Sequence, residues 1–351
     1  MEMIISHKSA LEYWRLHGNV KMDDLVRIRL KNLPDSIPKH SLIRGRTPLG
    51  LSHPINVMTG NKNAKRKTKI VWSRLYTGPI PKDCFIKIDD ELLVSTPQFC
   101  FFQMAGELSL IKLIELGFEL CGSYTLAAGC EPDKESEYSP VEHSDADEYS
   151  NGIEHIQESE SAPYEEKRTS KTLYGHPPLA STKVIADVVN HLKGVSGQKK
   201  TQRALRYIAG GSASPMETIL SMLLTLPHKL GGYGLPMPVL NKRINIGSEN
   251  KRQSGKSYYV CDLFWPKAKF AVEYDSDLFH TGADRIARDS EKRLSLTKLG
   301  ITTITITNKQ IRSAAEFESI AKLIAAKLGK QLRYTNQQFK KVNKELRGLL
   351  L

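Results

Sequence analysis

The sequence lacks any run of about 20 uninterrupted apolar residues, the length that a membrane-spanning helix needs. It also lacks the basic-then-apolar start of a secretory signal, because it begins MEMIISHKSALEYWR. Cysteine is scarce: the five residues include no CxxC pair and no Cys/His cluster at zinc spacing. These absences argue against a membrane protein, a disulfide framework and a zinc finger, and they predict a cytosolic protein with reduced cysteines.

Acidic residues are few outside one segment. Residues 131–170 contain 13 acidic and 3 basic residues, a net charge of −10, whereas the whole chain carries +13. The remaining residues therefore carry +23. A protein surface with so much positive charge favours the binding of polyanions, and nucleic acid is the most common polyanion in a cytosol. A basic surface that only keeps the protein soluble is the alternative.

The acidic segment divides the 351-residue chain, which is long enough for two cores. Glu, Ser and Asp dominate residues 131–170, which show almost no apolar periodicity, so we predict a disordered linker there. A weak DNA mimic lying on a basic groove is the alternative. We predict a smaller α+β domain over residues 1–130 and an α/β domain over residues 171–351, with its core at 212–329.

Residues 1–130 predict several short elements. A helix is expected over 9–18 and a second short helix over 23–32, followed by strands within 54–58, 69–76 and 84–88. The clearest element is a later helix with Ser95 as its cap and Pro97 in its first turn, with apolar residues at helical spacing through Leu116.

Residues 171–351 alternate between the two kinds of periodicity. The order is helices, a β-hairpin, a helix, a strand and a last helix, which is typical of a sheet packed between helices. The expected helices are 181–194, 199–211, 214–227, 282–300 and 313–329, and the expected strands are 257–266, 269–276 and 301–307.

Three carboxylates stand close together in the segment YYVCDLFWPKAKFAVEYDSDLFH. Alternate residues of a strand share a face, so Glu273 and Asp275 lie on the same face. A hairpin that turns at Pro266 brings Asp262 beside them. Carboxylates so placed repel one another, and Mg²⁺ or Mn²⁺ relieves the repulsion because hard cations prefer oxygen ligands. The segment therefore predicts a metal site that activates water against a phosphate.

Each of these residues also has a plainer interpretation. The acids form a solvated face in the alternative, although the apolar neighbours VCDLFW and FAVEY favour the metal site. His280 is either a general base or phosphate contact, or a structural histidine. Glu217 completes a capping box with Ser214, or it is a fourth acid that orients a water.

Basic residues gather at three places that suit phosphate contacts, although a charged face is usually only solvated. The first is a run between two expected strands, which is as readily a surface loop. The second lies on a helix that leads towards Glu217, and the third lies on the helix after the acids. Their members are Lys62, Lys65, Arg66, Lys67 and Lys69; then Lys199, Lys200, Arg203 and Arg206; then Arg285, Arg288 and Lys292.

The ordered combination of residues 212–320 resembles a bacterial family of endonuclease-like domains. That family is related to the very-short-patch-repair mismatch endonucleases, within the PD-(D/E)xK (restriction-endonuclease-like) superfamily. Its pattern is a helix Glu, a strand Asp, Glu-x-Asp, a His, an Asp-x-x-x-Arg helix, and a Gly before the final strand. The pattern falls on Glu217, Asp262, Glu273 with Asp275, His280, Asp289 with Arg293, and Gly300.

The resemblance implies a restriction-endonuclease-like mixed sheet flanked by helices, with Arg293 added to the DNA contacts. Three departures limit it. Asp275 stands where the superfamily has its motif lysine, as this family expects, so the catalytic base is undecided. Ser276 replaces a usual glycine, and Thr305 stands where the final strand often has arginine. The residues LLVSTPQFCFFQMA resemble a segment of actinobacterial proteins that join such a domain to a region similar to abortive-infection type IV antitoxins.

The sequence thus predicts a metal-dependent DNA endonuclease or nickase that hydrolyses phosphodiester bonds. Asp262 and Glu273 would hold Mg²⁺ or Mn²⁺, Asp275 would be a further ligand or orient a water, and His280 and Glu217 would assist. The alternative is a DNA-binding, antitoxin-like transcriptional regulator with an inactive nuclease-like domain. An interaction protein without nucleic acid is a third possibility.

Overall fold

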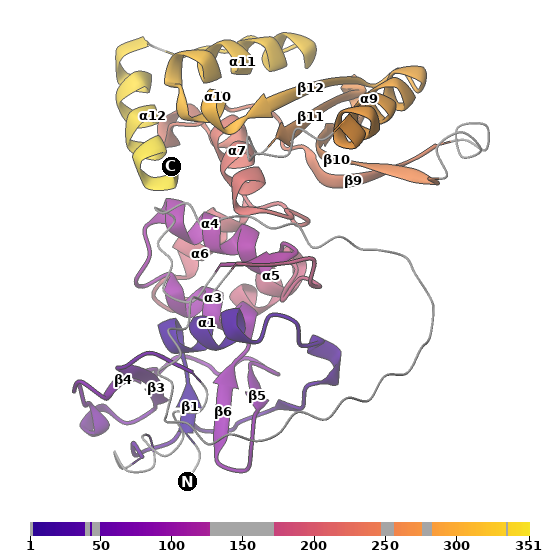
Figure 1. Cartoon of the computed structure of the whole chain (residues 1–351). Helices are drawn as coiled ribbons and strands as arrows, with labels where there is room; N and C mark the ends of the chain where they lie inside the picture. The colour runs from indigo at the N-terminus through magenta and orange to yellow at the C-terminus, as the bar shows by residue number, and fades with distance from the viewer. Residues whose placement is uncertain are drawn as a thin grey trace, which may run out of the picture.

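A computed structural model gives the architecture of the chain (Figure 1). The elements stack in three layers: a sheet formed by N-terminal residues, a group of helices, and a second sheet with its own helices towards the C-terminus. This mixture of helices and mixed sheets confirms the expected α/β class. The structure describes residues 3–38, 43, 50–126, 172–246, 256–275, 283–334 and 336–351, without the side chains of 283–286 and 336.

A six-stranded sheet in the order β2-β5-β6-β1-β3-β4 forms the first layer. β1 and β6 are parallel, as are β3 and β4, and the other neighbours are antiparallel. α1 (His7–Leu16) and α3 (Pro97–Met104) follow β1 and β6 directly and pack on each other. The strands are β1 (Met3–Ile5), β2 (Arg27–Ile28), β3 (Ile55–Thr59), β4 (Val71–Leu75), β5 (Phe85–Lys87) and β6 (Leu92–Ser95).

Two expectations for this layer were wrong. Residues 23–32 contain only a 3-10 turn, η1 (Met22–Asp24), and β2, because pairing with β5 outweighs the local helical pattern. The long helix starting at Ser95 is two helices, α3 and α4 (Leu110–Leu120). Ser95 itself ends β6, and Ser109 begins α4 by accepting a hydrogen bond from the Lys112 amide.

The middle layer joins helices from both sides of the acidic segment. α5 (Thr182–His191) and α6 (Gln198–Leu205) pack on α3 and α4. The Ser181 hydroxyl accepts from the Val184 amide, so the expected cap of α5 is confirmed. β7 (Tyr124–Thr125) and β8 (Leu173–Tyr174) pair across the segment. Residues 131–170 lie outside the described residues, and the domain division at residue 171 stays a prediction.

The last layer contains a four-stranded sheet in the order β12-β11-β10-β9. β10 (Tyr258–Trp265) is antiparallel to β9 (Val239–Asn245) and to β11 (Phe270–Asp275), whereas β12 (Thr302–Thr307) is parallel to β11. The helices of this layer are α7 (Pro215–Thr225), α9 (Ala283–Lys298), α10 (Asn308–Arg312), α11 (Ala314–Lys327) and α12 (Asn336–Leu350), with the 3-10 turns η4 (His228–Leu230) and η5 (Pro266–Ala268).

Helices cover both faces of this sheet. On one face Leu263, Val272 and Ile306 join the main core with α7, α10 and α11. On the other face Phe264 and Ala271 form a small core with Leu296 of α9. The expected hairpin, the following helix and the final strand are confirmed, whereas β9 and α12 were not expected. In the described part of the chain, no helix combines the length and apolar composition of a membrane span.

Candidate acidic site where two strands diverge

The candidate site lies where β10 parts from β11. Pairing between these two strands extends only to Leu263 and Val272. Beyond that point β11 continues beside β12 as far as Asp275, while β10 continues beside β9 as far as Tyr258. Asp262 bridges the opening, because its Oδ2 accepts a hydrogen bond from the Tyr274 amide at 2.8 Å. The divergence thus places a carboxylate inside the sheet rather than on its surface.

The strand geometry is also irregular on the β9 side. The register pairs Cys261 with Lys242 and Leu263 with Leu240 but skips the position between them. Asn241, at that position of β9, has a φ of 45°, a left-handed conformation that asparagine tolerates better than most residues. Cys261 and Phe264 both face the small core under α9. In a regular strand, two residues that are three positions apart would face opposite sides of the sheet. Both observations indicate a local kink at this position, which turns Asp262 out of the regular alternation.

Glu273 is paired with a cation from the helix that covers the sheet. Lys292 of α9 donates to its Oε2 at 2.5 Å, and both side chains are largely buried. Glu273 Oε1 is buried and has no nitrogen or oxygen donor in the described part of the chain. The Cys261 thiol lies beside this carboxylate, since burial and then the Glu273 charge raise the pKa of the thiol. A buried carboxylate oxygen left without a nitrogen or oxygen donor is costly, so this oxygen marks the place where a further positively polarised group would fit.

The electrostatics of the site are those of crowded acids. Burial, followed by the charges of Glu273 and Glu217, raises the pKa of Asp262 well above its usual range. Burial disfavours the charged form of Lys292, but Glu273 and Asp262 outweigh it and raise the pKa of the ammonium. Asp262 therefore feels the charges of Glu273 and Glu217, and Lys292 feels those of Glu273 and Asp262.

Glu217 takes part in the expected cap of α7, whereas its role as a fourth acid that orients a water stays a prediction. Ser214 starts α7 by accepting from the Glu217 amide, and the Glu217 carboxylate accepts from the Ser214 hydroxyl at 3.0 Å and the Ala213 amide at 2.9 Å. The same carboxylate accepts from Asn241 Nδ2 at 2.5 Å, which links it to the kinked strand. Burial raises the pKa of Glu217, and the Glu273 charge adds to that effect.

Two further residues, Asp275 and His280, were expected at the acidic site. Asp275 ends β11, and His280 lies outside the described residues. Within the described ranges, no three His, Cys, Asp or Glu side chains come together as a group that would hold a metal ion. The expectation that Asp262, Glu273 and Asp275 share one metal therefore stays a prediction.

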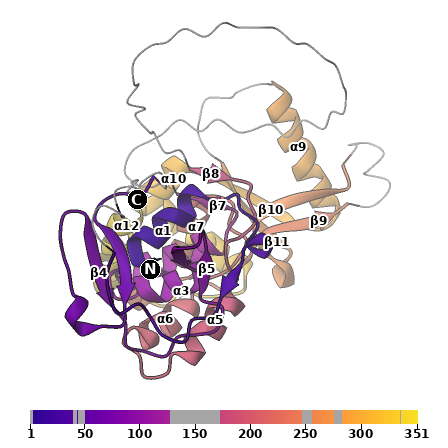
Figure 2. The same cartoon turned by 90° about the horizontal axis from the view of Figure 1, so that it is seen from below.

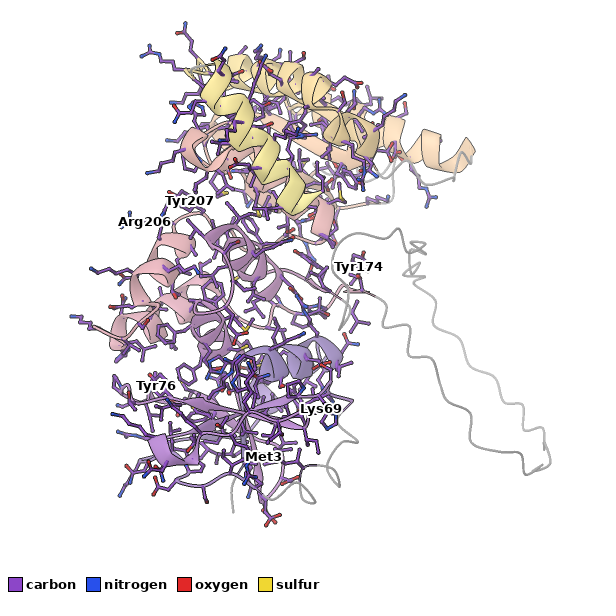
Figure 3. The ribbon with its side chains drawn as sticks, turned by 90° about the vertical axis from the view of Figure 1, so that its left-hand side faces the viewer. Met3, Lys69, Tyr76, Tyr174, Arg206 and Tyr207 are labelled. Atoms are coloured by element: carbon purple, nitrogen blue, oxygen red, sulfur yellow. The ribbon has the colours of Figure 1, made fainter. Side chains whose placement is uncertain are left out.

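The expected DNA-binding cations are spread over two helices. Lys199 and Arg203 are exposed on α6, as is Arg206 just after it, at the surface of the middle layer (Figure 3). Lys200 is engaged instead, since its ammonium donates to the backbone carbonyls of Ala105, at 2.9 Å, and Leu108.

The expected DNA contacts on α9 are three arginines. Arg288 and Arg293 are exposed, whereas the Arg285 side chain is not described. α6 lies in the middle layer, whereas β10, β11 and α9 lie in the last layer (Figure 1 and Figure 2).

Sequence patterns missed two residues of the site. Lys292 was noted only as part of a charged helix face, and Asn241 lay in a strand that was not expected. The helical spacing of α9 gives the direction of Lys292 relative to Leu296, but the partner depends on how α9 docks on the sheet. Asn241 followed by two cations carried no recognisable signal.

The comparisons with known proteins are limited. The chain is 26% identical over 128 residues, or 36% of its length, to an uncharacterized protein found in Mycobacterium tuberculosis strains CDC 1551 and H37Rv. The match covers 42% of those relatives, less than half of their length. No protein-family profile and no solved structure matches the chain.

Proposed function

We propose that this protein is a metal-dependent DNA endonuclease or nickase of the PD-(D/E)xK type. One observation carries the proposal: Asp262 and Glu273 lie close enough, where two strands diverge, for the charge of Glu273 to raise the pKa of Asp262, and Lys292 pairs with Glu273. Crowding these acids has an electrostatic cost, which burial increases. Strongly perturbed acids in such a position are typical of functional sites.

The donor set fits a hard divalent cation. Asp262 and Glu273 would hold it, and Glu273 Oε1, which has no nitrogen or oxygen donor among the described residues, is an oxygen ligand of the kind that Mg²⁺ prefers. When bound, such a cation supplies Lewis acidity and lowers the pKa of water at a phosphodiester. We propose no further ligand.

Lys292 has its own part in this proposal. The superfamily places a lysine two residues after the strand glutamate, where this chain has Asp275. Lys292 brings an ammonium to Glu273 from α9 instead. Held by that carboxylate, the ammonium is positioned to stabilise negative charge on a phosphate or to orient an attacking water. Asn241 and Ser214 fix Glu217, so the third acid is restrained from moving towards the pair.

The second candidate is a DNA-binding, antitoxin-like regulator whose nuclease-like domain is inactive. The observation in its favour is the same ion pair, because an ammonium at 2.5 Å neutralises the carboxylate that a metal needs. In that case Lys292 would have replaced the metal as the group that balances the acids. The first candidate function predicts that the protein cleaves DNA, and the second predicts that it does not.

Incubation with supercoiled plasmid in Mg²⁺, Mn²⁺ or EDTA tests the proposal. We expect nicked or linear plasmid only with a divalent metal. Glu273→Gln should abolish cleavage and keep or raise DNA affinity, because it removes a charge that repels phosphate. Its thermal midpoint should fall, because Lys292 loses its largely buried partner. His280→Ala should be milder, on the order of a 10²–10⁴-fold loss.

Glu345→Gln is the matched control, since this glutamate is exposed on α12. It should cleave like wild type. Wild-type protein that never nicks DNA with either metal would leave the regulator as the better description. Equal cleavage by the Glu273 variant would place the activity elsewhere or in a contaminant.

A further inference from the structure

The basic run of the N-terminal layer forms an ordered hairpin. Arg66 and Ser73 pair through the Arg66 amide to the Ser73 hydroxyl at 2.5 Å and the Ser73 amide to the Arg66 carbonyl at 2.7 Å. Lys67 stands opposite Trp72 as an isolated bridge. The turn is closed by the Thr68 amide donating to the Val71 carbonyl at 2.9 Å. Residues 65–73, here called the basic hairpin, are thereby fastened to β4.

Cations dominate this hairpin and its surroundings. Residues 62–76 contain six basic residues and no acidic residue. The side chains of Lys62, Lys65, Arg66, Lys67 and Lys69 are all exposed. The sixth cation, Arg74, is already paired with Glu107. Five like charges held at fixed positions on the surface repel one another, and a polyanion relieves that repulsion.

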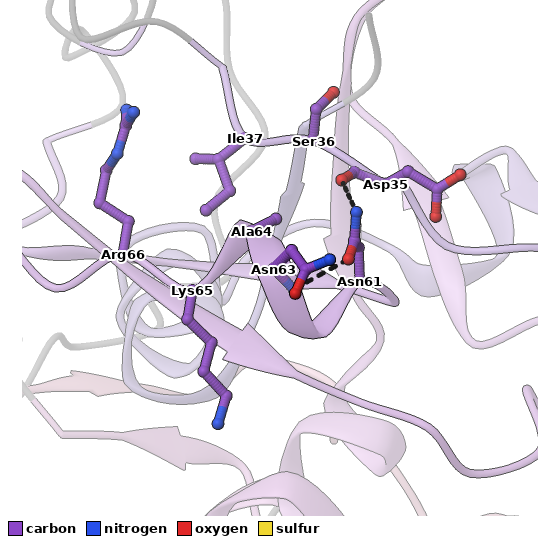
Figure 4. A pocket seen from close by; sticks show the side chains of 8 residues that line it. All are labelled: Asp35, Ser36, Ile37, Asn61, Asn63, Ala64, Lys65 and Arg66. Carbon is purple, nitrogen blue, oxygen red and sulfur yellow. Dashed lines mark hydrogen bonds between the residues drawn. The ribbon is translucent and has the colours of Figure 1, made fainter.

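Two open pockets flank the hairpin. One, of about 430 Å³, is lined by three cations, Trp72, Ser73 and Leu75, with no carboxylate. The other, of about 310 Å³, lies between residues 35–37 and 61–66. In Figure 4 the side chains of Lys65 and Arg66 point in opposite directions, and the Asp35 carboxylate points away from both. The hairpin therefore presents cations to both sides of a ridge.

Trp72 holds part of this arrangement in place. The Lys67 ammonium lies 4.2 Å from the centre of its ring, and the Arg74 guanidinium lies at 3.7 Å. These cation–π contacts restrict Lys67, so less side-chain entropy is lost when it meets an anion. The layer that carries the hairpin is at the opposite end of the molecule from the acidic site (Figure 1).

We propose that the basic hairpin is a second DNA-binding surface, which grips the phosphate backbone of duplex DNA through Lys65, Arg66 and Lys67, independently of the acidic site. The choice of DNA rests on the proposed function, but the surface does not depend on catalysis. A different reason for the same charges is protection of the sheet edge, because β4 is the last strand of its sheet and lysines discourage pairing with another chain.

The test measures binding of a labelled 20-base-pair DNA duplex by fluorescence anisotropy in EDTA, from about 50 to 200 mM KCl. The full chain carries Glu273→Gln, so cleavage plays no part. Charge reversal of Lys65, Arg66 and Lys67 to Glu is compared with reversal of Lys327, Lys330 and Lys340, which are exposed in the last layer. Both variants change the net charge equally.

Each lost phosphate contact lowers the slope of log K against log salt by about 0.9, so the hairpin variant should lose about 2.7 and bind at least about tenfold more weakly. The control should keep the wild-type slope. The same loss in both variants would overturn the proposal, because only net charge would matter.

In a second outcome, part of the hairpin-variant sample aggregates and the monomeric part binds DNA as before. This result would overturn the proposal in favour of edge protection. Stronger wild-type binding to an RNA duplex of equal length would overturn the choice of DNA. Replacement of the same three residues by Gln, with thermal midpoints for all variants, separates lost contacts from lost folding. A protein that binds in this way yet never cleaves would refute the proposed activity and leave the surface intact.

Discussion

Asp262 carries the main electrostatic conflict of the molecule. Its pKa in the folded protein is raised by burial and by two neighbouring acids, so it lies above that of the unfolded chain. Between the two pKa values the folded state binds more protons than the unfolded state. The free energy of unfolding therefore falls as the pH rises through that interval, and the conflict is absent below it.

Asp262→Asn should remove this conflict, because the amide has no charge and its oxygen still accepts from the Tyr274 amide. We expect the thermal midpoint at pH 7–8 to rise by roughly 2–4 °C, the effect of about 1 kcal/mol in a domain of this size. The gain should shrink as the pH is lowered towards 4. Calorimetry across this range measures it, and a midpoint that falls at every pH would show that the carboxylate is needed for folding.

Residue periodicity was enough to bring Asp262 near Glu273, because a hairpin register and a two-residue repeat are local properties. It was not enough to find Lys292 or Asn241. The first depends on the docking of α9 on the sheet, and the second depends on a left-handed residue in an unexpected strand. Side-chain partners across elements follow from packing, which no local pattern contains.

Single elements followed local signals where a cap was present. Ser181, Ser214 and Ser313 begin α5, α7 and α11 as hydrogen-bonded caps. The stretch expected as one helix from Ser95 to Leu116 contains such a cap in its middle, because Ser109 begins α4, and the expectation passed over it. The strands at 257–266 and 269–276 were expected, but their divergence was not, because it depends on the competing pairings with β9 and β12.

α6 offers a test of the other cationic surface. Arg203 on α6 and Arg206 just after it are exposed, whereas Lys200 donates to the carbonyls of Ala105 and Leu108 between α3 and α4. Reversing both arginines to Glu should lower the salt slope of DNA binding by up to about 1.8. Lys200→Gln should instead lower the thermal midpoint with the slope unchanged. Anisotropy titrations and thermal melts measure the two effects, and an unchanged slope in the arginine variant would exclude this face from the DNA surface.

In the described part of the chain the three layers share the main hydrophobic core, whose members run from Met3 to Leu350, and a small second core lies under α9. A molecule built this way holds the basic hairpin and the acidic site at fixed positions relative to each other. Binding at one end then raises the effective concentration of DNA at the other, provided the DNA is long enough to reach both.

The cleavage rate should therefore increase with duplex length by more than the number of cleavable positions accounts for. We expect cleavage of a 60-base-pair duplex, roughly 200 Å long, to exceed that of a 12-base-pair duplex, roughly 40 Å long, at equal base-pair concentration. The hairpin variant should lose this difference and keep its activity on the short duplex. A length dependence that survives in that variant would show that the two surfaces do not act on one DNA molecule.

The three tryptophans of the chain have very different surroundings. Trp14 and Trp265 are buried and donate to the carbonyls of Ser95 and Pro236. Trp72 lies between a lysine and an arginine at the surface of the basic hairpin. Iodide concentrates around such cations and caesium is repelled, so quenching by iodide isolates the fluorescence of Trp72 from that of the other two. The hairpin thus contains its own optical reporter, and an anion that occupies it shields that signal.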